Sequence, residues 1–295
     1  MTSNASGIPR RQDLLYHYTD AAGLIGILES QRLWASNAAY LNDPTELLYA
    51  RGIYREWLDA RTDQGIAKDL VGHVRVIDSL LEHIFHVFVA CFCRKGDLLS
   101  QWRGYGSGGR GFAIGIDRQM IGIRTPLASP VNFFVARVLY DQTEQKAELS
   151  ALLDPILDEL AEAERHQGAG AASSMMTARL GQIQRACLLK LVTFKHPAYK
   201  AEDEWRAISI YERDVPTTEL HFRAHGSLLI PYVKLDLSPS AGHQTGKIPI
   251  SEVIYGPTMN PPLTEKSLRL LLDKHGYPWT HTTIWPSEIP LRQMP

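Results

Sequence analysis

The sequence predicts an α+β protein, and three observations lead to this class. The chain has 295 residues, of which 44% are hydrophobic and 21% charged, a composition typical of soluble globular proteins. Segments with strand-like β-branched and aromatic content are mixed with segments of helical periodicity. They do not follow the strict strand–helix alternation of a doubly wound sheet. We therefore expect a mainly β scaffold that carries helices.

Charge and cysteine content narrow the functional classes. The formal net charge is -1, so a nucleic acid or an anionic membrane could be bound only by a local patch. Three cysteines, Cys91, Cys93 and Cys187, are too few for a disulfide framework and favour a reducing compartment. The N-terminus lacks the apolar stretch of a secretory signal, and no apolar run is long enough to span a bilayer. We expect a cytoplasmic protein without a membrane partner.

The first half of the chain predicts strands separated by helices. Residues 1–12 are polar and aperiodic and are expected to form a disordered tail, which leaves 13–295 as a single domain. Asp20 is a plausible N-cap for a helix over 21–31. Asp43, Pro44 and Glu46 form a start signal for a helix from 44 to about 61. Further helices are expected at 66–83 and 97–105, and strands at 14–19, 33–36, 86–93, 112–117 and 132–140.

The second half contains a compositional change. Residues 141–195 are rich in Ala, Leu, Glu and Gln around a glycine-containing centre, which predicts a helical hairpin inserted into the β scaffold. A short helix is expected at 267–276, ended by glycine. The strands expected here are 204–211, 228–237, 249–256 and 281–285.

Two apparent motifs are rejected on context. Gly104, Gly106 and Gly109 have dinucleotide-binding spacing, but they follow a helical segment and precede a strand, the reverse of a Rossmann motif. The histidines at 83 and 86 precede Cys91 and Cys93, with spacing that matches no standard zinc site. We therefore expect no metal.

Two strand segments place reactive side chains on rigid elements. In Tyr16-His17-Tyr18-Thr19, His17 and Thr19 point to the same side of an extended chain. In 202–206, Glu202, Glu204 and Arg206 share one face at the start of an apolar strand. A carboxylate in that position requires a partner or a function, because desolvation is unfavourable. An ion pair from Glu204 to Arg206 or Arg103 that only anchors the strand is the alternative, as is a hydrogen-bonded buried histidine for His17.

These segments resemble known families. YHYT at 16–19 followed by GLIGILESQRLWAS at 23–36 is similar to the opening of the ADP-ribosyltransferase superfamily, and the E-x-E pair is similar to its glutamate signature. A wider set of segments, over about residues 14–292, resembles a bacterial family named domain of unknown function 2971. This set comprises LYHYT, LWAS, YLNDPTEL, LLSQWRGYG, GFAIGID, EDEWR, EVIYGP and SEIPLR.

The superfamily resemblance implies a fold and a reaction. The fold would be a pair of antiparallel sheets packed around a cleft, with helical insertions, and the cleft would bind NAD as a substrate. His17 would bond the adenosine ribose, the Tyr18 backbone the nicotinamide amide, and Thr19 would support the nearby ribose. Glu204 would bond the nicotinamide ribose and stabilise the oxocarbenium-like cation that develops as the glycosidic bond breaks.

Further roles follow from the same resemblance. Glu202 would orient or deprotonate an acceptor, and Arg103 and Arg206 could bind the pyrophosphate through their guanidinium groups. The superfamily usually supplies an aromatic side chain that stacks on nicotinamide, and four residues compete for this role: Tyr40, Tyr49, Trp102 and Tyr105. Cys91-Phe92-Cys93 occupies the region in which some branches have a serine-containing strand motif.

Three hypotheses for function remain open. The first is an NAD-consuming ADP-ribosyltransferase or NAD glycohydrolase whose acceptor is a protein, a nucleic acid or water. The second is a non-catalytic module that binds a nucleotide in the same cleft. The third is a nucleic-acid-processing protein, which the neutral net charge disfavours. A role in bacterial defence or as a toxin is implied by the resemblance alone.

Overall fold

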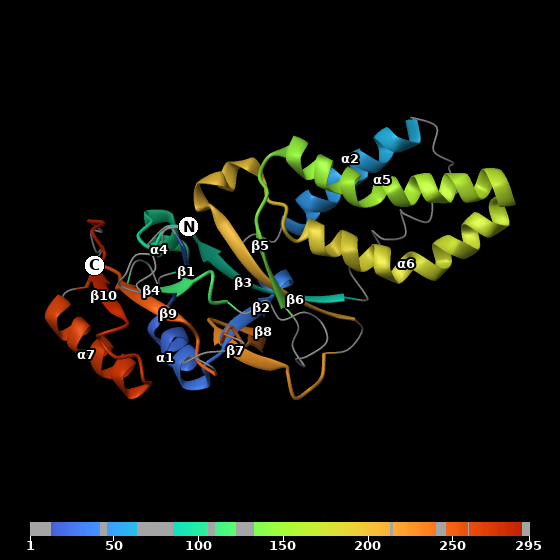
Figure 1. Cartoon of the computed structure of the whole chain (residues 1–295). Helices are drawn as coiled ribbons and strands as arrows, with labels where there is room; N and C mark the ends of the chain where they lie inside the picture. Colours follow the sequence, from blue (N-terminus) through green and yellow to red (C-terminus); the bar gives the residue numbers. More distant parts are fainter. Residues whose placement is uncertain are drawn as a thin grey trace.

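The computed structural model describes residues 13–41, 46–63, 85–105, 110–121, 133–212, 215–239, 246–258 and 260–290. Within these ranges ten strands form one hydrogen-bonded sheet, in which β9 and β10 are parallel and the other pairs antiparallel (Figure 1). The strands are β1 Leu14–Thr19, β2 Leu33–Asn37, β3 Phe85–Cys93, β4 Phe112–Asp117, β5 Phe133–Arg137, β6 Glu204–Glu212, β7 His221–His225, β8 Leu228–Leu235, β9 Ile250–Tyr255 and β10 Thr283–Pro286. The α+β class is confirmed, but the strands form one sheet instead of the expected pair.

The sheet forks at β3. β6 pairs with β3 along its whole length, from Phe85↔Glu212 to Cys93↔Glu204, and therefore occupies one edge of it. The other edge is shared: β2 pairs with Phe88 and Val89, while β1 pairs only with Cys93. Between these contacts β1 and β2 separate. We call β1, β4, β9 and β10 the β1 arm, and β2, β8 and β7 the β2 arm.

Helices cover both faces of this sheet. The helices are α1 Ala21–Ser30, α2 Glu46–Asp63, α4 Leu99–Tyr105, α5 Gln142–Gln167, α6 Ala169–Leu191 and α7 Pro261–Lys274, with short 3-10 helices η2 Ala38–Tyr40 and η3 Pro197–Glu202. α1 and α7 pack apolar side chains against the main core of the sheet. α2, α5 and α6 form a separate helical layer with its own core at the other end of the molecule (Figure 1).

Local signals in the sequence explain many of these boundaries. Asp20 caps α1 by accepting a hydrogen bond from the Gly23 amide at 2.7 Å, and Asp141 caps α5 in the same way. Gly168 separates α5 from α6 with φ 87°, a conformation that favours glycine. The predicted helical hairpin is therefore present, and β1 and β4 have the predicted bounds.

Some expectations need correction. β7 was not expected, since its residues HFRAH lack a strand-like alternation, and it forms by pairing with β8. α7 begins at Pro261, six residues earlier than expected, because Asn260 caps it. The expected tail at 1–12 and the helix at 66–83 lie outside the described residues. Of the helices that the structure describes, none is both long and apolar enough to cross a membrane.

Candidate functional site

A buried cluster of charged side chains lies where β6 begins. Glu204, the first residue of β6, is 4% exposed. Its carboxylate accepts hydrogen bonds from Arg206 Nε at 2.8 Å and from Lys195 Nζ at 2.8 Å. Its backbone amide donates to the Tyr140 hydroxyl at 3.0 Å. Glu204 is thus held on several sides.

Arg206 extends this cluster toward the helical layer. Its guanidinium also donates to the Glu46 carboxylate at the start of α2 and to the Val192 carbonyl at 2.6 Å, just beyond α6. Lys195 in turn bridges Glu204 to Glu202, whose carboxylate lies 2.7 Å from Nζ. Charges from the sheet and from the helical layer therefore pair with one another in a nearly dry environment.

The pKa values in the cluster follow from burial opposed by charge. Burial alone would raise the pKa of Glu204, but Arg206 and Lys195 outweigh it and lower that pKa to about 2. Burial would lower the pKa of Lys195, whereas Glu204 and Glu46 raise it above its usual value. The pKa of Glu46 is raised by burial, against the opposing charge of Arg206. Glu204 and Lys195 are consequently both ionised near neutral pH.

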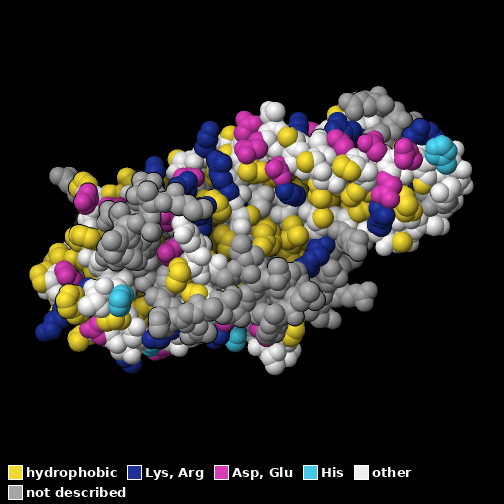
Figure 2. Space-filling model, in the orientation of Figure 1, with side chains coloured by type: hydrophobic (Ala, Val, Ile, Leu, Met, Phe, Trp, Pro, Cys, Tyr) yellow, Lys and Arg dark blue, Asp and Glu magenta, His cyan; other side chains and the backbone are white. Residues whose placement is uncertain are grey.

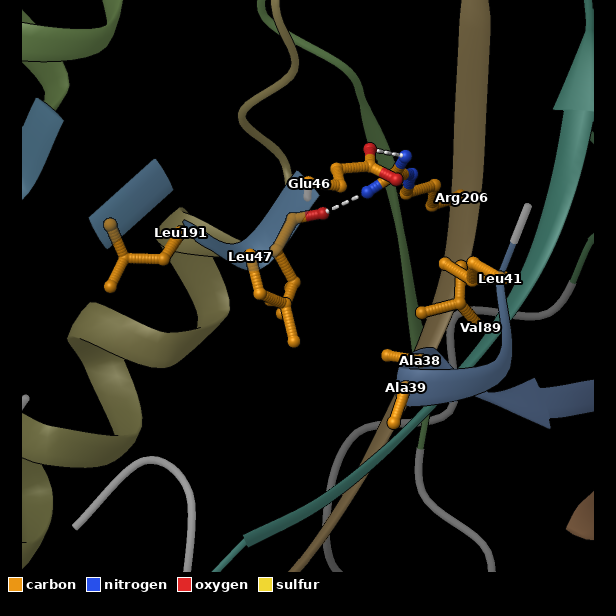
Figure 3. Close-up of a pocket in the computed structure, with 9 residues that line it drawn as sticks. Ala38, Ala39, Leu41, Glu46, Leu47, Val89, Leu191 and Arg206 are labelled. Atoms are coloured by element: carbon orange, nitrogen blue, oxygen red, sulfur yellow. Dashed lines mark hydrogen bonds and ion pairs between the residues drawn. The ribbon is translucent and has the colours of Figure 1, made fainter. Parts of the chain in front are cut away.

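A small pocket borders the cluster (Figure 3). Arg206 and Glu46 form its polar side, while Leu41, Leu47 and Val89 belong to its apolar lining. Its volume of about 30 Å³ has room for about two water molecules. Figure 2 shows hydrophobic side chains gathered where the sheet meets the helical layer.

His17 lies at the fork of the sheet. It is partly buried, and its Nδ1 donates to the carbonyl oxygen of Cys91 at 2.9 Å. Its ring meets Phe92 edge-on, with the centroids 6.0 Å apart. Burial lowers the pKa of His17, so the neutral imidazole is favoured. The Cys91 thiol lies beside the Glu204 carboxylate and contributes to lowering its pKa. Cys91 therefore binds His17 through its backbone carbonyl, while its side chain lies beside Glu204.

The register places His17 and Glu204 on different faces of the sheet. Tyr16 is paired with Cys93 and Cys93 with Glu204, so these three side chains share a face. His17, the next residue along β1, points to the opposite face, where it contacts Phe92. The two candidate residues are neighbours around Cys91, but they do not face each other across one cavity.

The other residues of the YHYT segment serve the fold. The Tyr18 hydroxyl donates to the Lys95 carbonyl at 2.8 Å and accepts from the Leu98 amide at 3.0 Å. Its ring packs edge-on against Trp102. Thr19 ends β1 and lies against Gly23 of α1, close enough that a Cβ there would clash with its hydroxyl.

Two of the four aromatic candidates, Tyr105 and Tyr49, lie near the charged cluster, Tyr49 with its ring edge-on to His196, which follows Lys195. Tyr105 is partly buried beside it, and burial followed by the charges of Cys91 and Glu204 raises its pKa. Trp102 is fully buried and donates to Asp97 at 2.7 Å. Tyr49 belongs to the helical layer, where its hydroxyl donates to Gln145, and Tyr40 is 44% exposed on η2.

Arg103 and Arg206 were both expected to bind pyrophosphate, but they lie in different surroundings. Arg103 is exposed on α4, whereas Arg206 is buried in the cluster, so the structure does not bring the two guanidinium groups together.

Glu202 was expected to share a strand face with Glu204, but it ends η3 and the chain reverses at Asp203, with φ 42°. Glu202 still joins the cluster because Lys195 binds both carboxylates.

Sequence reasoning missed Lys195 and Glu46. Glu46 was interpreted only as a helix-start residue, although it is buried against Arg206. Lys195 follows the apolar run LVTF, and a lysine in such a position signals a buried charge that needs a carboxylate. Cys91 was not expected to lie beside Glu204. Burial raises its pKa well above the usual value, which disfavours a thiolate nucleophile.

No candidate metal centre occurs among the described residues. No group of three or more His, Cys, Asp or Glu side chains there has a suitable arrangement. The histidine at position 83, part of the rejected zinc pattern, lies outside the described residues.

Comparison with known proteins gives one family match. The model of the family described as "Protein of unknown function (DUF2971)" matches residues 101–207. This segment runs from α4 into β6 and includes Lys195, Glu202, Glu204 and Arg206. The match supports the resemblance to that family over this part of the chain, and no resemblance to ADP-ribosyltransferases is shown. No curated protein and no solved structure matches the chain.

Proposed function

We propose that the chain binds NAD, or a closely related nucleotide, at the fork and cleaves its nicotinamide–ribose bond as an ADP-ribosyltransferase or NAD glycohydrolase. One observation carries this proposal. Three adjacent strands, β1, β3 and β6, bring His17, Cys91 and Glu204 together at the point where the sheet opens, with His17 hydrogen-bonded to the Cys91 carbonyl. The superfamily resemblance attributes NAD binding to His17 and bond cleavage to Glu204.

The electrostatics of Glu204 suit this reaction. As the glycosidic bond breaks, nicotinamide leaves with the bonding electron pair, and positive charge develops on the ribose. With a pKa of about 2, Glu204 remains an anion and can stabilise that cation without taking up a proton. An acceptor hydroxyl or water then bonds to the ribose carbon and releases its proton. Glu202, which is more exposed than Glu204, would receive it.

The proposal also requires the cluster to rearrange. Arg206 and Lys195 occupy both oxygens of Glu204, so a ribose hydroxyl must displace one of them. A protein acceptor is favoured over a nucleic acid because the net charge is -1.

A second candidate function is nucleotide binding without turnover. Both oxygens of Glu204 already accept hydrogen bonds, and His17 lies on the other face of the sheet. These two observations favour binding without turnover. A carboxylate already paired with two cations stabilises the fold and has little remaining capacity to stabilise a transition state. In this case the fork would hold the nucleotide, and Glu204 would only support β6.

The test measures nicotinamide release and NAD binding by the purified chain. We expect Glu204→Gln to lose about a hundredfold or more in release rate, while His17→Ala weakens NAD binding. Glu252→Gln is the matched control, since Glu252 is a buried carboxylate on β9 that accepts from Tyr16 away from the cluster. Urea unfolding of each variant verifies folding.

The outcomes separate the two candidates. The enzyme is supported if nicotinamide release depends on Glu204. Because the pKa of Glu204 is about 2, the release rate should then show no acidic limb above pH 4. NAD binding without release supports the binding module. Absence of both overturns the proposal and its alternative.

A further inference from the structure

The β2 arm gathers all its basic side chains on one face. β2, β8 and β7 contain no Asp or Glu. Their register pairs Ser36 with Tyr232, Tyr232 with His221, and Ile230 with Arg223, so these side chains share a face. The full set on this face is Trp34, Ser36, His221, Arg223, His225, Leu228, Ile230, Tyr232 and Lys234. The opposite face supplies Leu33, Ala35, Val233 and Leu235 to the core.

Arg223 is the most constrained of these basic residues. It is partly buried, and its guanidinium donates to the Ser36 hydroxyl at 3.1 Å. Within the described part of the chain no carboxylate pairs with it. Asp20 is near enough to raise its pKa slightly against the dominant effect of burial, but the Asp20 side chain caps α1 at Gly23. A half-buried guanidinium with one hydroxyl partner retains donors for an anion.

The charges of Arg223 and Lys234 act on neighbouring histidines. Burial has the largest effect on the pKa of His17 and lowers it, and the hydrogen bond to the Cys91 backbone raises it. The charge of Arg223 comes next and lowers this pKa further. Burial and then Lys234 lower the pKa of His221, against a smaller opposing effect of Glu219. Arg223 is thus close enough to the fork for its charge to affect the pKa of His17. A local patch of this kind is what a protein of nearly neutral net charge needs to bind an anion.

The basic face continues into the candidate site. Ser36 is paired with Val89, and Cys91, two residues along β3, points to the same side. Cys91 is paired with Arg206. Arg223 and Ser36 therefore lie on the face that carries Glu204 and the pocket. Trp34 stacks on Tyr232 on the same face, with ring centroids 4.7 Å apart. This stacked pair forms a rigid aromatic surface.

We infer that Arg223, positioned by Ser36, binds the diphosphate group of the nucleotide held at the fork. This inference rests on the proposed function and names a residue that the resemblance did not. It also replaces the two arginines expected from the sequence. Arg206 already donates to Glu204, Glu46 and Val192, and Arg103 is exposed on α4.

The test compares ligands that differ in phosphate content. ADP, inorganic diphosphate and adenosine are titrated calorimetrically into the full chain and into Arg223→Gln, Arg223→Lys and Arg179→Gln. Arg179 is the charge-matched control, since its partner is Glu159 in the helical layer. We expect Arg223→Gln to weaken ADP and diphosphate binding about tenfold or more, with adenosine affected less. Arg223→Lys should recover part of the affinity, and Arg179→Gln should bind as the wild type does.

The result does not depend on catalysis. Diphosphate binding that requires Arg223 supports the inference even if no nicotinamide is released, in which case the proposed enzyme activity alone fails. NAD cleavage with an unchanged KM in Arg223→Gln overturns the inference and leaves the activity intact. ADP affinity within twofold of the wild type in a folded Arg223→Gln, or no binding of either phosphate ligand at millimolar concentration, also overturns it.

Discussion

Lys195 determines whether the carboxylates at the start of β6 can stay buried. Its side chain is 5% exposed and lies within hydrogen-bond distance of both Glu202 and Glu204. An uncompensated buried carboxylate is far less favourable than a paired one. Arg206 alone would leave Glu202 without its cation and Glu204 with only one. The lysine is therefore a condition for the chemistry proposed for Glu204.

Replacing Lys195 by methionine tests this dependence. Lys195→Met keeps the length of the side chain but removes the charge, and we expect a loss of about 3–5 kcal/mol in the free energy of unfolding. The control is Lys190→Met, because Lys190 pairs with Glu148 at the surface, where both side chains are about 40% exposed. That change should lose less than about 1 kcal/mol. Urea unfolding measures both, and equal losses would contradict a special role for Lys195.

At the scale of elements, α1 reaches the β2 arm through a glycine. A Cβ added at Gly26 would lie 2.3 Å from Cζ2 and 2.5 Å from Cη2 of Trp34. Trp34 is stacked on Tyr232, so movement of its indole ring would disturb this aromatic pair, which lies on the same face as Arg223. Close approach of helix and indole therefore requires glycine at this position, despite its unfavourable helix propensity.

The pair Gly26→Ala and Gly52→Ala separates packing from propensity. Both glycines lie inside helices, but among the described residues no atom beyond its chain neighbours and the backbone of its own helix comes within 4 Å of a Cβ placed at Gly52. We expect Gly26→Ala to destabilise the chain by about 1–3 kcal/mol and Gly52→Ala to stabilise it by about 0.5–1 kcal/mol. Thermal unfolding gives the sign of each change. Stabilisation by both substitutions would show that Trp34 moves aside freely.

At the scale of the molecule, the two largest apolar cores are joined by a smaller apolar cluster and by ion pairs. One core lies between the sheet and α1 and α7, and the other lies within α2, α5 and α6. Between them, Leu188 and Val192 pack on β3 and β6, and the cluster of Arg206, Glu46 and Lys195 links the layers. The charged site is therefore also the joint between the helical layer and the sheet.

This division predicts that the helical layer opens separately. Leu157→Ala removes a side chain buried in the core of α2, α5 and α6, at a loss of about 2–5 kcal/mol. Hydrogen exchange should then accelerate in those helices, while β1, β4 and β9 keep their protection. Leu272→Ala, in the core beneath the sheet, is the control and should accelerate exchange in the sheet. A uniform increase in Leu157→Ala would show that the two cores unfold together.

Much of the fold is readable from local sequence. Asp20 and Asp141 are N-caps whose side chains the structure shows bonded to the first turn of each helix, and LLYHYT and FAIGID are strands with the predicted bounds. Strand pairing is different. HFRAH has no pattern of its own, and it becomes β7 only because β8 folds back beside it. Its arginine could not be recognised as a ligand candidate before that pairing was known.

The sequence by itself determined the α+β class, the helical hairpin and the need of Glu204 for a charged partner, because caps, periodicity and a carboxylate in an apolar strand are local properties. Only the tertiary structure decided that the sheet forks at β3, that Lys195 and Glu46 pair with Glu204 and Arg206, and that His17 lies on the opposite face from Glu204. These features depend on register between strands distant in the chain. A shift of one residue reverses the face of every side chain in a strand.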